Sequence, residues 1–209
     1  MSSPYAPSLR DEIAAVAARL IAEDGLDYAG AKRRAAREVL GDAARSHGDC
    51  MPDNVQVAEA VREHQALFMA DTQPARLLAL RLLARDVMRF LDEAGLGLTP
   101  FVNGAIVNGT AGEHSDIHLQ VFDDNAKDLA IHLLNAGIEF EVSEHAGGGE
   151  LLSFLWPQRR GPAPAPRITD QEAVHLAVLA PRDQRGSPSA ERADLRALDG
   201  LIDATPDPT

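Results

Sequence analysis

The sequence has one cysteine, few aromatic residues and no excess of positive charge. Cys50 has no second cysteine with which to form an internal disulfide, as is typical of proteins from a reducing cytoplasm. Only 4% of the 209 residues are aromatic, whereas 45% are hydrophobic, so we expect a core of leucine, alanine, valine and isoleucine. The formal net charge of -12 argues against non-specific binding of nucleic acid or acidic membranes across the whole surface.

Long apolar runs and several familiar catalytic motifs are also missing. No run of about 18 apolar residues can span a bilayer, and the N-terminal stretch places acidic residues before a short apolar segment, unlike a secretory signal. The chain contains no Walker A loop, GxSxG elbow, CxxC pair or GxGxxG fingerprint. We therefore predict a soluble cytoplasmic protein with neither a membrane partner nor a disulfide partner.

The hydrophobic period changes from helical to alternating near residue 99. Before it, apolar residues recur about every 3.6 positions, which predicts four helices. After it, alternation predicts strands, interrupted by one helix. The predicted helices span 8–23, 27–40, 54–70, 74–94 and 124–136, and the predicted strands span 100–107, 115–122, 138–145, 151–156 and 172–179. Helices followed by β-β-α-β-β-β indicate an α+β fold with a mixed sheet covered by helices.

This pattern predicts three regions. Residues 1–98 form an N-terminal region of about four helices, and residues 99–180 form the α+β core. Residues 181–209 form a tail that begins disordered and contains a short amphipathic helix around 190–202. The proline-rich stretch 157–166 is predicted to be an extended loop.

Asp116 and His118 are the first candidate functional pair. Side chains alternate along a strand, so these two share one face, while Ile117, Leu119 and Val121 take the other. A carboxylate and an imidazole at this spacing can ligate one metal ion. A strand near a turn also displays such polar residues to water without any ligand.

Asn108–Gly112 and a pair of glutamates are weaker candidates. Glycines let a backbone approach a ligand closely, so Gly109 and the Thr110 hydroxyl can hold phosphate oxygens, although Asn-Gly is also an ordinary turn signal. Glu139 and Glu141 share one face of a later strand. If that strand is a neighbour of the Asp116 strand, one of these glutamates can complete a metal site.

Taken together, these residues resemble the polymerase-β-type nucleotidyltransferase superfamily, over roughly residues 99–156. The resemblance implies that Gly109 and Thr110 hold the nucleotide phosphates and that Asp116 is the first metal aspartate. It implies Glu139 or Glu141 as the third acid and Mg²⁺ or Mn²⁺ as the cofactor. In this sequence His118 stands where the family has its second aspartate, and the glycine–aspartate spacer is short.

Three arginines are candidates for neutralising the charge of a bound triphosphate. Arg81, Arg85 and Arg89 recur every four residues and therefore share one face of a predicted helix. The alternative interpretation is a solvated helix face opposite a leucine stripe, with acidic residues as partners.

Three functions remain open from the sequence. The first is metal-dependent transfer of a nucleoside monophosphate from a nucleoside triphosphate to an unknown acceptor such as RNA or a protein. The second is a degraded nucleotidyltransferase-fold protein that binds nucleotide, RNA or a protein partner. The third is a zinc- or manganese-binding domain of other chemistry, because a neutral imidazole at His118 disfavours Mg²⁺.

Overall fold

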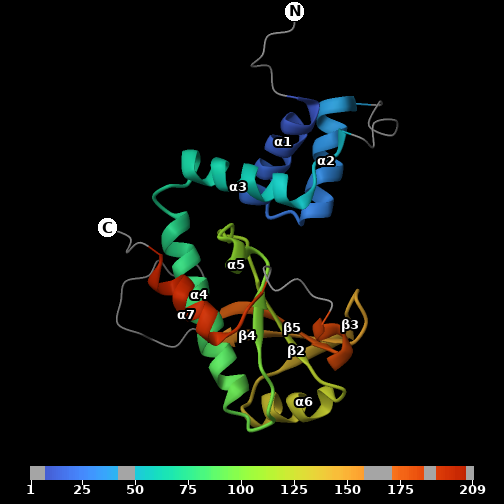
Figure 1. The fold of residues 1–209 in the computed structure, drawn as a ribbon, viewed down its shortest axis with the longest axis vertical. Helices are drawn as coiled ribbons and strands as arrows, with labels where there is room; N and C mark the ends of the chain where they lie inside the picture. Colours follow the sequence, from blue (N-terminus) through green and yellow to red (C-terminus); the bar gives the residue numbers. More distant parts are fainter. Residues whose placement is uncertain (1–7, 42–49, 158–170, 186–191, 206–209) are drawn as a thin grey trace, which may run out of the picture. The chain divides into compact units, whose positions relative to one another are not determined.

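The computed structural model divides the chain into two compact units. It describes residues 8–41, 50–157, 171–185 and 192–205. The first unit comprises Met1–Gln73 and Gly112–His114, and the second comprises Pro74–Ala111 and Ser115–Thr209. The described helices mostly precede the strands, and the strands form one mixed sheet, so the predicted α+β class is confirmed (Figure 1).

The first unit is built from three helices, α1 (Leu9–Asp24), α2 (Tyr28–Leu40) and α3 (Asn54–Phe68). Side chains at the N-caps define where these helices begin: Asp27, for example, accepts a hydrogen bond from the Gly30 N–H at 2.8 Å, as the sequence predicts. The core of the unit is small and alanine-rich, and its buried members are Ile13, Ala17, Ala18, Leu20, Ala31, Ala35, Ala36, Val57 and Val61.

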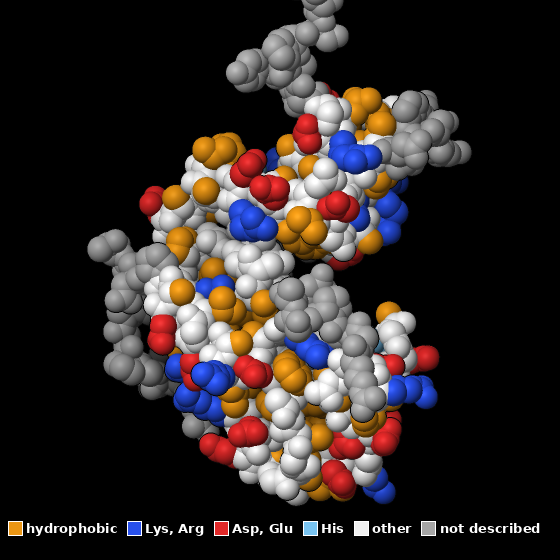
Figure 2. Space-filling view, in the orientation of Figure 1, with side chains coloured by type: hydrophobic (Ala, Val, Ile, Leu, Met, Phe, Trp, Pro, Cys, Tyr) orange, Lys and Arg blue, Asp and Glu red, His pale blue; other side chains and the backbone are white. Residues whose placement is uncertain are grey.

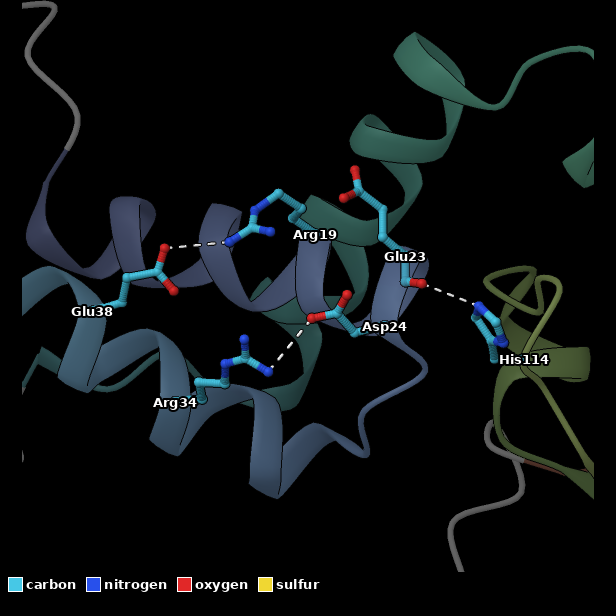
Figure 3. Close-up of polar contacts among 6 residues, drawn as sticks. All are labelled: Arg19, Glu23, Asp24, Arg34, Glu38 and His114. Atoms are coloured by element: carbon cyan, nitrogen blue, oxygen red, sulfur yellow. Dashed lines mark hydrogen bonds and ion pairs between the residues drawn. The ribbon is translucent and has the colours of Figure 1, made fainter.

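Surface ion pairs link the helices of this unit (Figure 3). Arg19 pairs with Glu38 at 3.3 Å, and Arg34 pairs with Asp24 at 3.5 Å. His114 belongs to the same unit, because its Nε2 lies 3.1 Å from the Glu23 carbonyl oxygen. Each such exposed ion pair contributes little to the free energy of unfolding, so the packing of the small core provides most of the stability of this unit.

The second unit consists of a long helix, α4 (Gln73–Asp92), packed on a six-stranded sheet. The strands lie in the order β3-β4-β5-β2-β1-β6, in which only the β2–β5 pair is parallel. Their bounds are β1 Phe101–Asn103, β2 Ile117–Phe122, β3 Phe140–Glu144, β4 Glu150–Pro157, β5 Gln171–Leu179 and β6 Arg192–Ala193.

One face of the sheet forms the core with the helices. Helices α4, α6 (Ala126–Asn135) and α7 (Leu195–Asp203) contribute buried residues to the same cluster as the sheet. The strand residues on this face are Val102, Ile117, Leu119, Val121, Leu152, Phe154, Trp156, Val174, Leu176 and Val178. Because side chains alternate along a strand, the polar residues between them lie on the other face.

A buried ion pair joins α4 to β5. The guanidinium of Arg76 donates two hydrogen bonds to the carboxylate of Glu172, at 2.6 and 2.9 Å. Both residues are buried, at 7% and 6% exposure. Two parallel hydrogen bonds between charged groups are among the stronger polar contacts in proteins, so this pair fixes where α4 crosses the sheet.

The structure differs from the sequence-based expectations in several places. The predicted strand 100–107 ends at Asn103, and residues 105–108 form a helical turn instead, α5 (Ala105–Asn108). The compact units meet at residues 73 and 74 rather than at 98 and 99, because α4 packs on the sheet. In the predicted tail, the structure has a 3₁₀ turn at Pro181–Arg185 and strand β6, which were not predicted, whereas α7 overlaps the short helix that was predicted around 190–202.

Two other expectations concern parts of the chain outside the description. The predicted extended loop 157–166 lies outside the described residues except for Pro157, and residues 186–191 of the predicted tail also lie outside them. Among the helices that the structure describes, none has the length and apolar character needed to cross a lipid bilayer. Figure 2 shows acidic and basic side chains interspersed over the visible face of both units.

The β3–β4 turn ends at a glycine that we expect to be irreplaceable. Gly149 has a φ of +84°, and a Cβ there would overlap the Val178 carbonyl oxygen of β5. We expect Gly149→Ala to lower the free energy of unfolding by about 2–4 kcal/mol, from the left-handed backbone and the overlap together. The measurement is urea unfolding followed by the fluorescence of Trp156, the only tryptophan in the chain.

Gly148 provides the matched control for this prediction. It has a similar φ of +87°, but a Cβ there would meet no atom within 4 Å. Gly148→Ala should therefore cost only the backbone strain, about 1–2 kcal/mol. Equal losses for the two variants would contradict the close approach between the turn and β5.

Candidate functional site

Polar side chains form a row across the exposed face of the sheet. The ladder pairs Glu141 of β3 with Ser153 of β4, Ser153 with His175 of β5, and His175 with His118 of β2. Paired residues in neighbouring strands project from the same face, so these four side chains lie side by side. We call this set, together with Asp116 at the start of β2, the polar row.

His175 lies at the centre of a hydrogen-bonded chain. Its Nε2 lies 3.3 Å from Asp116 Oδ2, and its Nδ1 lies 2.9 Å from the Ser153 hydroxyl oxygen. An ionised carboxylate can only accept, so Nε2 carries the proton of the neutral ring and Nδ1 accepts from the hydroxyl. The side chains of His175 and Asp116 are 27% and 48% exposed, so the chain of contacts is open to solvent at the Asp116 end.

His118 stacks on His175. The two ring centroids are 5.1 Å apart and the planes are inclined by 21°. Partial removal of the ring from water is the main cause that lowers the pKa of His118, and the neighbouring His175 lowers it further, while Asp116 opposes the shift. The residue keeps an exposed edge, so it remains accessible to a ligand as a neutral imidazole near pH 7.

A hollow of about 780 Å³ lies beside the polar row. It extends from the end of α6 across β3, β4 and β5, and Ser153 and His175 form part of its wall. Its lining combines the apolar side chains of Leu155 and Ala173 with three members of the polar row, Glu141, Ser153 and His175. Its volume is within the range of pockets that bind small organic ligands.

The two glutamates predicted as the third acid lie far from Asp116. β3 is at the edge of the sheet, and β4 and β5 separate it from β2. At about 4.8 Å per strand, Glu141 is about 14 Å from β2, and Glu139 precedes the same edge strand. The condition for either glutamate to join a metal site, a strand adjacent to β2, is not met.

The strand that is adjacent to β2 contributes a histidine. β5 runs parallel to β2 and brings His175 opposite His118. We did not single out His175 from the sequence, although it is the one polar residue in the otherwise apolar run Ala173–Leu179. Neither His175 nor Ser153 could be recognised as a site residue, because pairing between strands that are distant in sequence cannot be derived from periodicity.

Gly109 and Thr110 form a closed turn. Gly109 ends α5 with a φ of +83°. Thr110 is only 4% exposed. The side-chain oxygen of Asn108 accepts two hydrogen bonds from it, one from the Thr110 hydroxyl at 2.6 Å and one from the Thr110 N–H at 3.0 Å. In this conformation the Thr110 hydroxyl donates its proton within the turn rather than to an external phosphate.

The three arginines of α4 face α7. Arg81 is buried and donates to the carbonyl oxygens of Ile106 and Leu201 and to the Thr205 hydroxyl. Burial lowers the pKa of Arg81, yet a guanidinium stays charged at neutral pH. Arg85 and Arg89 lie 3.5 and 3.8 Å from the Asp199 carboxylate of α7. The arginine face is thus an interface between two helices, not a wholly solvated surface.

The polar row is a poor site for magnesium. Mg²⁺ requires octahedral coordination by oxygen, and the positions beside one another on β2 and β5 supply one carboxylate and two imidazoles. Across the described residues, no group of three or more His, Cys, Asp or Glu side chains is arranged so that it could hold a metal ion. Comparison of the chain with family models, curated proteins and solved structures finds no match.

Proposed function

We propose that the chain is a nucleotidyltransferase-like protein that binds a nucleotide and does not carry out magnesium-dependent transfer. The observation that carries this proposal is the parallel pairing of His118 with His175. The resemblance places the metal ligands on such neighbouring strands, and here only Asp116 is acidic. One carboxylate cannot neutralise two magnesium ions or hold them against a triphosphate.

Features of the hollow support nucleotide binding. Its apolar part, with Leu155 and Ala173, suits the flat face of a base, and the hydroxyl of Ser153 suits a ribose or phosphate oxygen. The imidazole of His118, next to His175 on the neighbouring strand, can donate to a phosphate oxygen without the charge repulsion that a cluster of carboxylates would cause.

Binding and transfer are separated by one pair of experiments. Calorimetry with each nucleoside triphosphate, in a chelator, measures binding by the full chain. Binding that falls at least tenfold in His175→Ala, but not in a control change of His145 in the β3–β4 turn, supports the hollow as the site. If no nucleotide binds to the well-folded chain, the proposal is wrong.

The transfer reaction has its own expected result. We expect no transfer of label from α-³²P nucleoside triphosphates to cell RNA or protein by the native chain with Mg²⁺. The double variant His118→Asp, His175→Asp places three carboxylates on the adjacent strands, and we expect it to bind Mg²⁺ more tightly, by tenfold or more. Transfer by the native chain that Asp116→Ala abolishes would establish instead the enzyme that the sequence first suggests.

A further inference from the structure

The Asp116–His175 contact has the dimensions of two ligands on one metal ion. Zinc binds imidazole nitrogen and carboxylate oxygen at about 2.0–2.1 Å, so two such donors on a tetrahedral ion are about 3.3–3.4 Å apart. Asp116 Oδ2 and His175 Nε2 are 3.3 Å apart. Replacing the shared proton by a metal ion therefore requires little movement of either side chain.

Ser153 supplies the outer contact that a metal-binding histidine needs. A histidine that ligates through one ring nitrogen usually donates its other N–H to a fixed acceptor, which orients the ring. The Ser153 oxygen lies 2.9 Å from His175 Nδ1. When the metal occupies Nε2, the ring proton moves to Nδ1, and the hydroxyl accepts it instead of donating. A hydroxyl can do both, so Ser153 fits both states.

His118 can provide the third ligand once its side chain rotates away from its present stacked orientation. Its ring stacks on His175 with centroids 5.1 Å apart, and the described residues offer its ring nitrogens no hydrogen bond that would hold the present orientation. Rotation of this exposed side chain can bring a nitrogen to the ion between Asp116 and His175. Solvent or a ligand takes the fourth position on the exposed face.

We propose that Asp116, His118 and His175 bind a single zinc-class transition-metal ion, and that Ser153 orients His175. Two imidazoles and one carboxylate are ligands that zinc and cobalt accept readily and magnesium does not. The inference deepens the proposed function, because His175, one of the three ligands, also forms part of the wall of the hollow. It rests on the same site but not on nucleotide binding itself.

Cobalt titration of the full, untagged chain tests the inference. A tetrahedral Co²⁺ ion with nitrogen and oxygen ligands gives intense visible absorption, whereas an octahedral surface-bound ion does not. We expect saturation at one ion per chain, displacement by Zn²⁺, and no competition from millimolar Mg²⁺. His118→Ala, His175→Ala and Asp116→Asn should each weaken binding more than tenfold.

Ser153→Ala isolates the positioning role. Loss of an outer contact to a metal ligand typically weakens binding by about 10- to 100-fold while the stoichiometry is kept. Ser143→Ala, on the exposed strand β3, is the matched control and should bind like the native chain. His175→Gln, checked by circular dichroism, shows whether any loss in His175→Ala comes from misfolding.

The outcomes distinguish this inference from the proposed function. Absence of tetrahedral Co²⁺ binding, or binding unchanged in His175→Gln and His118→Ala, overturns the metal site. Nucleotide binding in chelator would then leave the proposed function intact. Conversely, tight Co²⁺ binding without any nucleotide affinity would support the metal site and reject the nucleotide-binding function.

Discussion

Glu172→Ala is expected to lower the free energy of unfolding by about 3–5 kcal/mol, the usual cost of breaking a buried ion pair. The change removes the two hydrogen bonds that the Arg76 guanidinium donates, while the guanidinium itself stays buried. Trp156 is paired with Glu172 across the β4–β5 ladder, so its fluorescence during urea unfolding reports on this unit.

A double variant tests the reason for this loss. Replacing both partners by apolar residues, Arg76→Met with Glu172→Leu, removes the charges together and should recover most of the stability, because desolvation offsets much of the attraction in a buried pair. If the double variant is as unstable as Glu172→Ala, the loss comes from packing, and the charge explanation is wrong.

Leu176→Ala should produce the second large effect, a loss of about 2–5 kcal/mol. Leu176 is fully buried on β5, a central strand of the sheet, and belongs to the cluster that packs under α4 and α6. Truncation removes buried surface and leaves a cavity that neighbouring strands cannot easily close. The same urea titration measures it.

The control lies on the neighbouring strand. Leu155 of β4 is 55% exposed on the opposite face, so Leu155→Ala should change the stability by less than about 0.5 kcal/mol. Similar losses for the two leucines would mean that the face with the polar row is covered as fully as the core face.

Local patterns in the sequence predicted most of the elements but not their partners. Helix α4 and strand β5 were recognisable because their apolar residues follow one period without interruption. The period does not say which strands meet. The insertion of β4 and β5 between β3 and β2 therefore separated Glu141 from Asp116 and brought His175 to His118.

The arginines of α4 illustrate the same limit. Their four-residue spacing correctly placed them on one face, because that is a property of the helix alone. What covers that face depends on α7, more than a hundred residues later, whose Asp199 carboxylate and Leu201 carbonyl oxygen contact them. A hydrogen-bonded interior arginine such as Arg81 looks in sequence like an exposed, ligand-binding one.

The position of β5 between β4 and β2 also determines when the sheet can assemble during synthesis of the chain. β2 and β4 leave the ribosome before Gln171, yet neither can pair with β5 until Gln171–Leu179 has emerged. A nascent chain that ends before Gln171 thus carries Asp116, His118 and Ser153 on two separate antiparallel pairs with unsatisfied inner edges. Sheets joined by such long-range contacts form late and slowly. Of the four strands that carry the polar row, the last to be made is the one that assembles the site.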